Sequence, residues 1–185
     1  NEVPPGFIEE LEKLDTDLSP SREPQNMRES IPPGTIDIIR NIESDGKWWA
    51  KNPNSTAAGL YQFTESTWDN IRELAPELRL TKNGRTSSDP DQQDRAMWWL
   101  MEQNAGALVR GGLEPTTENL YAAHFLGSSD AVQVLKAPKN TKMKSLVDPE
   151  VMRANGFKGS MKVKDFEAWV SQKVEKAVEQ SIVEN

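Results

Sequence analysis

Residues 42–63 read IESDGKWWAKNPNSTAAGLYQF and hold an acid, a pair of tryptophans and a Gly-Leu-aromatic-Gln-aromatic segment close together. Upstream, isoleucines recur at helical spacing after a Pro-Pro-Gly break, which predicts a helix beginning near Thr35 and ending before Gly46. Glu43 lies two turns beyond Ile36 on the same stripe of this helix. Its carboxyl is therefore expected to point toward the apolar side rather than into water.

The remainder of the chain predicts further helices of moderate length. Helix starts are expected where a capping residue precedes an apolar run, at Thr64, at Asp89-Pro90, at Thr116 or Thr117 and at Ser128, with a last amphipathic helix through Phe166, Val170, Val174 and Val178. Residues 137–160 are expected to be irregular. The expected fold class is mainly α, with at most a minor β-ribbon near residues 50–58. We expect a single globular helical domain over residues 31–185, preceded by a leader or linker over residues 1–30, which are rich in Pro, Glu, Asp and Ser.

Composition narrows the function classes. A length of 185 residues suits one domain, and a net charge of −7 argues against a nucleic-acid partner, which needs a basic face. The chain has no cysteine and a single histidine, His124, so thiolate and His-based metal sites are not expected, and no cofactor is implied. No apolar run reaches membrane-spanning length, so no membrane span is expected. The chain begins with Asn, which suggests a piece of a longer protein.

Glu43 is the candidate for acid–base chemistry. A glutamate near a helix end is commonly a boundary residue. An apolar surround penalises the charged carboxylate and raises its pKa, and the negative end of the helix acts in the same direction. Cleavage of a glycosidic bond needs such a carboxylic acid, protonated near neutral pH.

Three segments together resemble the lytic transglycosylase family (soluble lytic transglycosylases, lysozyme-like). They are Glu43-Ser44, Gly59-Leu60-Tyr61-Gln62 and Ala123-His124-Phe125, and the resemblance covers roughly residues 34–136. In that family a Glu-Ser pair ends a helix, Gly-Leu-Met-Gln lines the sugar groove and Ala-Tyr-Asn closes the site. The third segment here lacks the Tyr and the Asn. Its His-Phe-Leu-Gly ending is more similar to the transglycosylase domains of tailed-phage virion proteins.

The resemblance implies a fold of the lysozyme-like α+β superfamily and an enzyme that cuts peptidoglycan without hydrolysis. Glu43 would protonate the β-1,4 oxygen between MurNAc and GlcNAc and then accept the proton of the C6 hydroxyl, which closes to 1,6-anhydroMurNAc. The residues expected to contact substrate are Ser44, Gln62, Tyr61, Phe63, His124, Tyr121 and Trp48.

Several of these residues have a second interpretation. Tyr61 and Phe63 would be equally typical of a core, and adjacent Trp48 and Trp49 cannot both face the core. His124 stands at the family's Tyr position, where it could bond Glu43 or substrate. It is expected to be neutral, because a proton on it would lower the pKa of Glu43.

Two other functions stay open. A hydrolytic muramidase would need a second carboxylate to hold water, for which Asp45 is poorly placed whereas Asp89 and Asp130 remain candidates. A non-catalytic peptidoglycan-binding or structural virion module would fit the altered third segment. The expected partners are glycan strands and a larger virion or cell-envelope protein. The expected location is virion-associated, acting in the bacterial periplasm or cell wall during genome entry; the alternative is a periplasmic or secreted bacterial enzyme.

Overall fold

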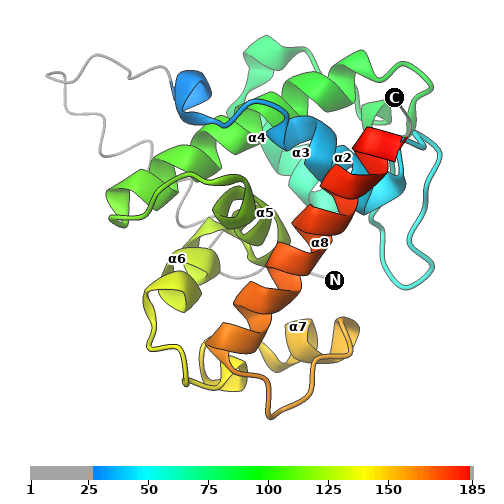
Figure 1. Ribbon diagram of the computed structural model, residues 1–185. Coiled ribbons are helices and arrows are strands. Elements are labelled where there is room, and N and C mark those ends of the chain that lie inside the picture. Colours follow the sequence, from blue (N-terminus) through cyan, green and yellow to red (C-terminus); the bar gives the residue numbers. More distant parts are fainter. Residues whose placement is uncertain (1–26, 184–185) are drawn as a thin grey trace, which may run out of the picture.

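The structure, a computed structural model, describes residues 27–183 and is built from helices (Figure 1). The α-helices are α2 (Thr35–Ser44), α3 (Glu65–Leu74), α4 (Asp91–Arg110), α5 (Thr117–Leu126), α6 (Ser128–Lys136), α7 (Pro149–Ala154) and α8 (Val163–Val183). Single 3-10 turns occur at η1 (Met27–Ser30), η2 (Pro76–Leu78), η3 (Gly84–Thr86) and η4 (Met143–Ser145). Within this range the only β-pairing is isolated bridges, two of them in the loop between α2 and α3. The prediction of a mainly helical chain is confirmed. Of the expected leader over residues 1–30, only residues 27–30 lie within the described part.

Local capping explains where several helices begin. Thr64 accepts a hydrogen bond from the Thr67 N–H at 3.2 Å and starts α3, and Thr116 accepts from the Asn119 N–H at 3.1 Å and starts α5, as the sequence predicts. At α4, Asp89 accepts from the Asp91 N–H at 3.1 Å, and the helix begins one residue beyond Pro90.

The expectation that residues 137–160 are irregular was wrong in part. The side chain of Asp148 accepts from the Glu150 N–H at 2.8 Å, and Pro149 takes the first position of α7. Proline suits this position because its missing N–H would have no partner there. Asn155, which follows α7, lines a cavity beside the C-terminal end of α2.

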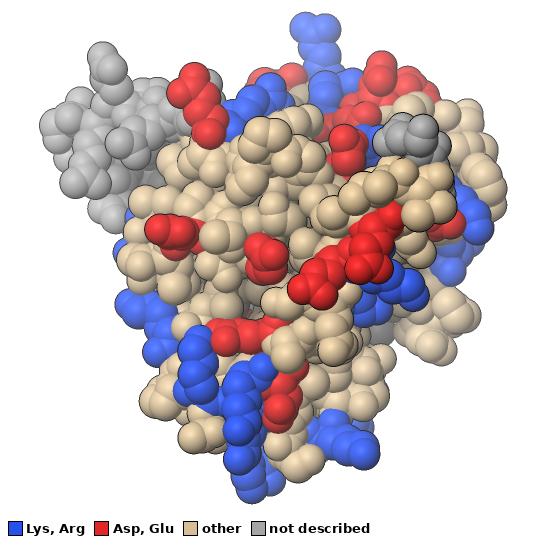
Figure 2. Space-filling model, viewed as in Figure 1, with Lys and Arg blue, Asp and Glu red and all other residues tan. Residues whose placement is uncertain are grey.

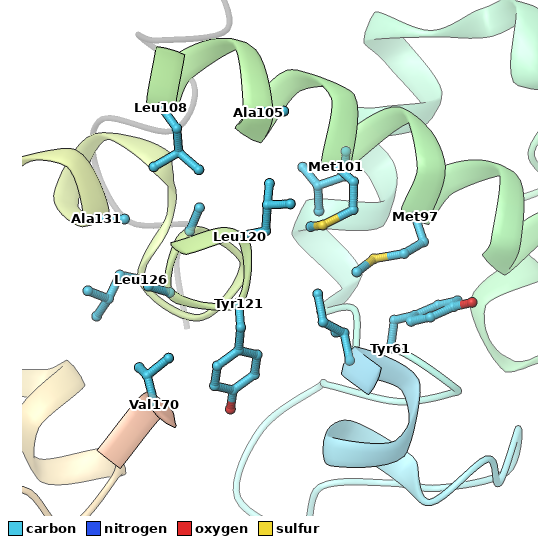
Figure 3. Packing of buried hydrophobic residues seen from close by; sticks show 14 of the residues in the cluster. Tyr61, Met97, Met101, Ala105, Leu108, Leu120, Tyr121, Leu126, Ala131 and Val170 are labelled. Carbon is cyan, nitrogen blue, oxygen red and sulfur yellow. The ribbon is translucent and has the colours of Figure 1, made fainter. Parts of the chain in front are cut away.

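Helix α4 forms the centre of the core. Its residues Met97, Met101 and Leu108 are fully buried, and α5 lies against it with Leu120 buried as well (Figure 3). Burying each such side chain stabilises the fold by roughly 1.5–3 kcal/mol. The packing fixes α5 between α4, α6 and α8.

Helix α8 crosses both α2 and α5 (Figure 1). Its apolar stripe of Phe166, Val170, Val174 and Ala177 is buried in the domain. This packing brings the far end of the chain beside the end of α2, where Glu43 lies. None of the helices within residues 27–183 combines the length and apolar character needed to span a membrane.

Candidate active site

A cavity of about 460 Å³ opens beside the C-terminal end of α2. Residues from α2, the loop before α3, α4, α5 and α8 contribute to its wall. Its polar lining consists of Glu43, Asn52, Gln62, Thr64, Thr67, Asn104, Tyr121, His124, Asn155 and Lys173. Of the residues expected to contact substrate, the cavity brings together Glu43, Gln62, Phe63, Tyr121 and His124. Ser44, Tyr61 and Trp48 are not part of its lining.

Glu43 is the penultimate residue of α2, and its side chain is 19% exposed. Its carboxylate accepts no hydrogen bond from any described residue, so it is available to a bound molecule. Burial raises the pKa of Glu43 from 4.5 to about 7, and the charge of Lys173 acts in the opposite direction. A substantial fraction of the carboxyl is therefore protonated at neutral pH.

His124 lies next to Glu43 as a neutral ring. Burial lowers the pKa of His124 to about 4, although its hydrogen bond to a backbone carbonyl acts against this. The neutral ring donates its Nε2–H to the Tyr61 carbonyl at 3.1 Å, which fixes the tautomer. Nε2 lies 4.0 Å from Glu43 Oε1, too far for the hydrogen bond that the sequence suggested. Without a charge, His124 leaves the pKa of Glu43 high.

Gln62 is held in a strained conformation at the cavity wall. Its φ is 54°, unusual for a residue with a side chain. Its Nε2 donates to the carbonyls of Gly59 at 2.9 Å and Ala50 at 3.3 Å. Both bonds use the amide nitrogen, so the amide oxygen, which meets no donor among residues 27–183, can accept from a substrate N–H or O–H.

The Gly-Leu segment before Gln62 is clamped to α4. Fully buried Gln93 accepts a hydrogen bond from the Leu60 N–H at 2.8 Å. At Gly59 φ is +82°, and a Cβ would lie 2.2 Å from Gln93 Oε1 and 2.3 Å from the Arg85 carbonyl oxygen. Only glycine fits this close approach.

Tyr61 and Ser44 form hydrogen bonds with Arg40 on α2, the helix that carries Glu43. The hydroxyl of fully buried Tyr61 donates to Asp94 at 2.6 Å and accepts from Arg40 at 2.8 Å. Ser44 donates to the Arg40 carbonyl at 3.1 Å. The bonds of Tyr61 tie α2 to the loop and to α4, whereas the bond of Ser44 stays within α2. Neither residue lines the cavity.

The two adjacent tryptophans lie on the surface of the same loop. Trp48 is 37% exposed and Trp49 is 59% exposed, and their rings meet edge to face at 5.6 Å. The expectation that at least one of them faces away from the core is confirmed.

Tyr121 offers the cavity a hydroxyl with no partner among the described residues. Its ring points away from the side chains of α4 (Figure 3). Burial, and then the charge of Glu43, raises the pKa of Tyr121 well above its usual range. It therefore stays a hydrogen-bond donor within electrostatic reach of Glu43. It stands one turn before His124 on α5, so a phenol is present although the family's Tyr position holds His.

Several lining residues were not expected from the sequence, among them Asn104, Trp169 and Lys173. Asn104 on α4 is 2% exposed, and its side-chain amide nitrogen is buried without a hydrogen-bond partner. A polar residue on the apolar stripe of α4 was the available signal. Trp169 and Lys173 come from α8. The ring centre of Trp169 lies 4.9 Å from that of Phe125 and 5.9 Å from that of Phe166. No local pattern indicates that α8 reaches this cavity.

Glu43 is the only acidic residue among the described residues of the cavity wall. Asp45, Asp89 and Asp130, considered as a second carboxylate, do not line it. Over residues 27–183, no three His, Cys, Asp or Glu side chains gather as a metal site would require. The chemistry that the cavity offers is that of one raised-pKa acid surrounded by amides, hydroxyls and aromatic rings.

Comparison with protein-family models finds none that matches this chain, and comparison with curated proteins finds no significant match.

Proposed function

We propose that this chain is a peptidoglycan lytic transglycosylase with a lysozyme-like fold, similar to the transglycosylase domains of tailed-phage virion proteins. One observation carries the proposal: Glu43, with a pKa of about 7 and no hydrogen-bond partner among the described residues, lines a cavity of about 460 Å³. A carboxyl in that state can donate a proton at neutral pH and accept one afterwards.

In the proposed reaction Glu43 protonates the oxygen between MurNAc and GlcNAc as the bond to C1 breaks. The 2-acetamido group of MurNAc stabilises the cationic C1. Glu43, now a carboxylate, takes the proton of the C6 hydroxyl, whose oxygen bonds to C1 and gives the 1,6-anhydro end. Atoms and protons balance without water, so one carboxylate suffices. This departs from the two-carboxylate scheme of most glycosidases.

The other polar groups of the cavity suit the substrate. The free amide oxygen of Gln62 can accept from an acetamido N–H, and the hydroxyl of Tyr121 can donate to a sugar oxygen. Trp169, which is only partly buried, supplies an aromatic ring against which a sugar ring can pack. Phe63 is 2% exposed and contributes to the apolar wall.

The single acid also favours this reaction over a hydrolytic muramidase. Hydrolysis by inversion needs a second carboxylate across the groove to activate water. The described wall of the cavity supplies no such group. The context we propose is a virion-associated or cell-envelope protein that opens the wall locally in the bacterial periplasm, with peptidoglycan strands as its partner.

The test is solubilisation of dye-labelled peptidoglycan by the wild type, by Glu43→Gln and by a matched control, Glu77→Gln, at an exposed glutamate of η2. We expect the wild type and the control to release dye equally and Glu43→Gln to release none. Retained binding of peptidoglycan by an inactive wild type would instead identify a non-catalytic binding module.

A further inference from the structure

A second, smaller cavity of about 230 Å³ adjoins the first along the edge of α8. Ile42 and Lys173 line both cavities, so a substituent on a sugar in the main cavity can extend into the smaller one. Its remaining wall comes from Asn41, Asp45, Lys176, Ala177 and Gln180.

The charged groups of the smaller cavity favour an anion. Lys173 and Lys176 lie three residues apart on α8, so their Cβ atoms are roughly 5–6 Å apart on the helix surface. The lining of the smaller cavity includes one carboxylate, Asp45, and Glu43 of the main cavity also acts on Lys173. The amides of Asn41 and Gln180 can donate further hydrogen bonds.

Neither lysine forms an ion pair with a described carboxylate, although the charge of Lys173 reaches Glu43. No described carboxylate lies within ion-pair distance of either ammonium, and Lys173 only extends over the ring of Trp169, 5.4 Å from its centre. Figure 2 shows acidic side chains along the C-terminal half of α8 with basic ones beside them.

We propose that Lys173 and Lys176 form a subsite for a carboxylate carried by the substrate, so that the enzyme selects anionic muramyl glycan over neutral glycan. This inference rests on the proposed function, because the lactyl ether of MurNAc ends either in its own carboxylate or in an acidic peptide. Both sources present the same group to the two ammonium ions.

The experiment measures binding in a Glu43→Gln background, which prevents turnover. Three fluorescently labelled glycans serve as probes: a neutral chito-oligosaccharide, a peptide-free MurNAc-GlcNAc oligosaccharide with its lactyl carboxylate, and the same oligosaccharide bearing stem peptides. We expect the carboxylate-bearing probes to bind roughly three- to tenfold more tightly than the neutral one. This preference should shrink as salt is raised.

Adding Lys173→Gln and Lys176→Gln is expected to remove the preference. Lys164→Gln is the matched control, because it removes the same charge from an exposed position on α8 that lines neither cavity. Tighter binding of the peptide-free probe would assign the subsite to the lactyl carboxylate, which the peptide-bearing probe has lost to an amide bond. Tighter binding of the peptide-bearing probe would assign it to a carboxylate of the peptide, and equal affinity would mean that the subsite accepts either carboxylate.

Two results would contradict the inference while leaving the proposed function intact. One is a preference that survives the double substitution, and the other is a preference that Lys164→Gln removes equally. Failure to bind any of the three glycans would instead contradict the proposed function itself.

Discussion

Replacing Glu43 by Gln is expected to abolish cleavage and, at alkaline pH, to stabilise the folded protein. Burial raises the pKa of this carboxyl from 4.5 to about 7. In the unfolded chain the carboxyl is solvated and loses its proton near pH ~4.3. Between these two values the folded state binds more protons than the unfolded state, so stability falls as pH rises through the window.

The size of this pH-dependent change in the free energy of unfolding follows from the two pKa values of Glu43. The full cost of holding the ionised carboxylate is about 3–4 kcal/mol and is approached above pH ~8. About 2 kcal/mol of it develops between pH 5.5 and pH 8.5. Gln does not titrate, so the stability of Glu43→Gln relative to the wild type should grow by about that amount over this range.

Urea unfolding of both proteins at pH 5.5 and 8.5 measures the difference between their free energies of unfolding. All other titrating groups are common to the two proteins, so their contributions cancel in this difference. Glu77→Gln measures the effect of removing one charge at an exposed site. A Glu43→Gln difference that stays constant with pH, or that grows toward acid pH, would refute the account of a desolvated acid.

Three further predictions concern the site and its support. Lys173→Met should move the basic limb of the pH–rate profile to higher pH, because the ammonium lowers the pKa of Glu43; an unmoved limb would show that the charge does not reach the acid. Tyr121→Phe should lower kcat/KM roughly tenfold and change stability by less than about 0.5 kcal/mol, because the lost hydroxyl bonds no described residue; unchanged kinetics would remove it from the site. Gly59→Ala should destabilise the fold by about 2–4 kcal/mol, because φ is +82° and the added Cβ meets Gln93 Oε1 at 2.2 Å; an urea midpoint equal to that of the wild type would contradict the close approach.

Features that depend on neighbouring residues were predictable from the sequence. Thr64 and Thr116 begin helices because their hydroxyls accept backbone N–H groups three residues on. Asp148-Pro149 carries the same kind of signal as Asp89-Pro90, yet α7 was not expected. Its six residues are too few to show the apolar period that accompanies a longer helix.

The candidate site was predictable only in part, because some of its residues are brought there by tertiary packing rather than by local pattern. Glu43 and Gln62 follow from local pattern and motif. The helical period could place Tyr121 on α5 but could not show that its hydroxyl reaches the cavity. The contribution of Trp169 and Lys173 depends on how α8 crosses α2 and α5, which is decided by tertiary packing.

Some side chains form hydrogen bonds with groups that a sequence pattern does not identify as their partners. His124 was a candidate to bond Glu43, but the Tyr61 carbonyl takes its Nε2–H instead. Tyr61, within the motif segment, points into a network with Arg40 and Asp94 rather than into the cavity.

The most direct test of the central claim is mass spectrometry of the products that the wild type and Glu43→Gln release from purified peptidoglycan. A single acid that works without water predicts 1,6-anhydroMurNAc ends from the wild type and no products from the variant. Reducing ends that carry one added water would show hydrolysis and would contradict the account.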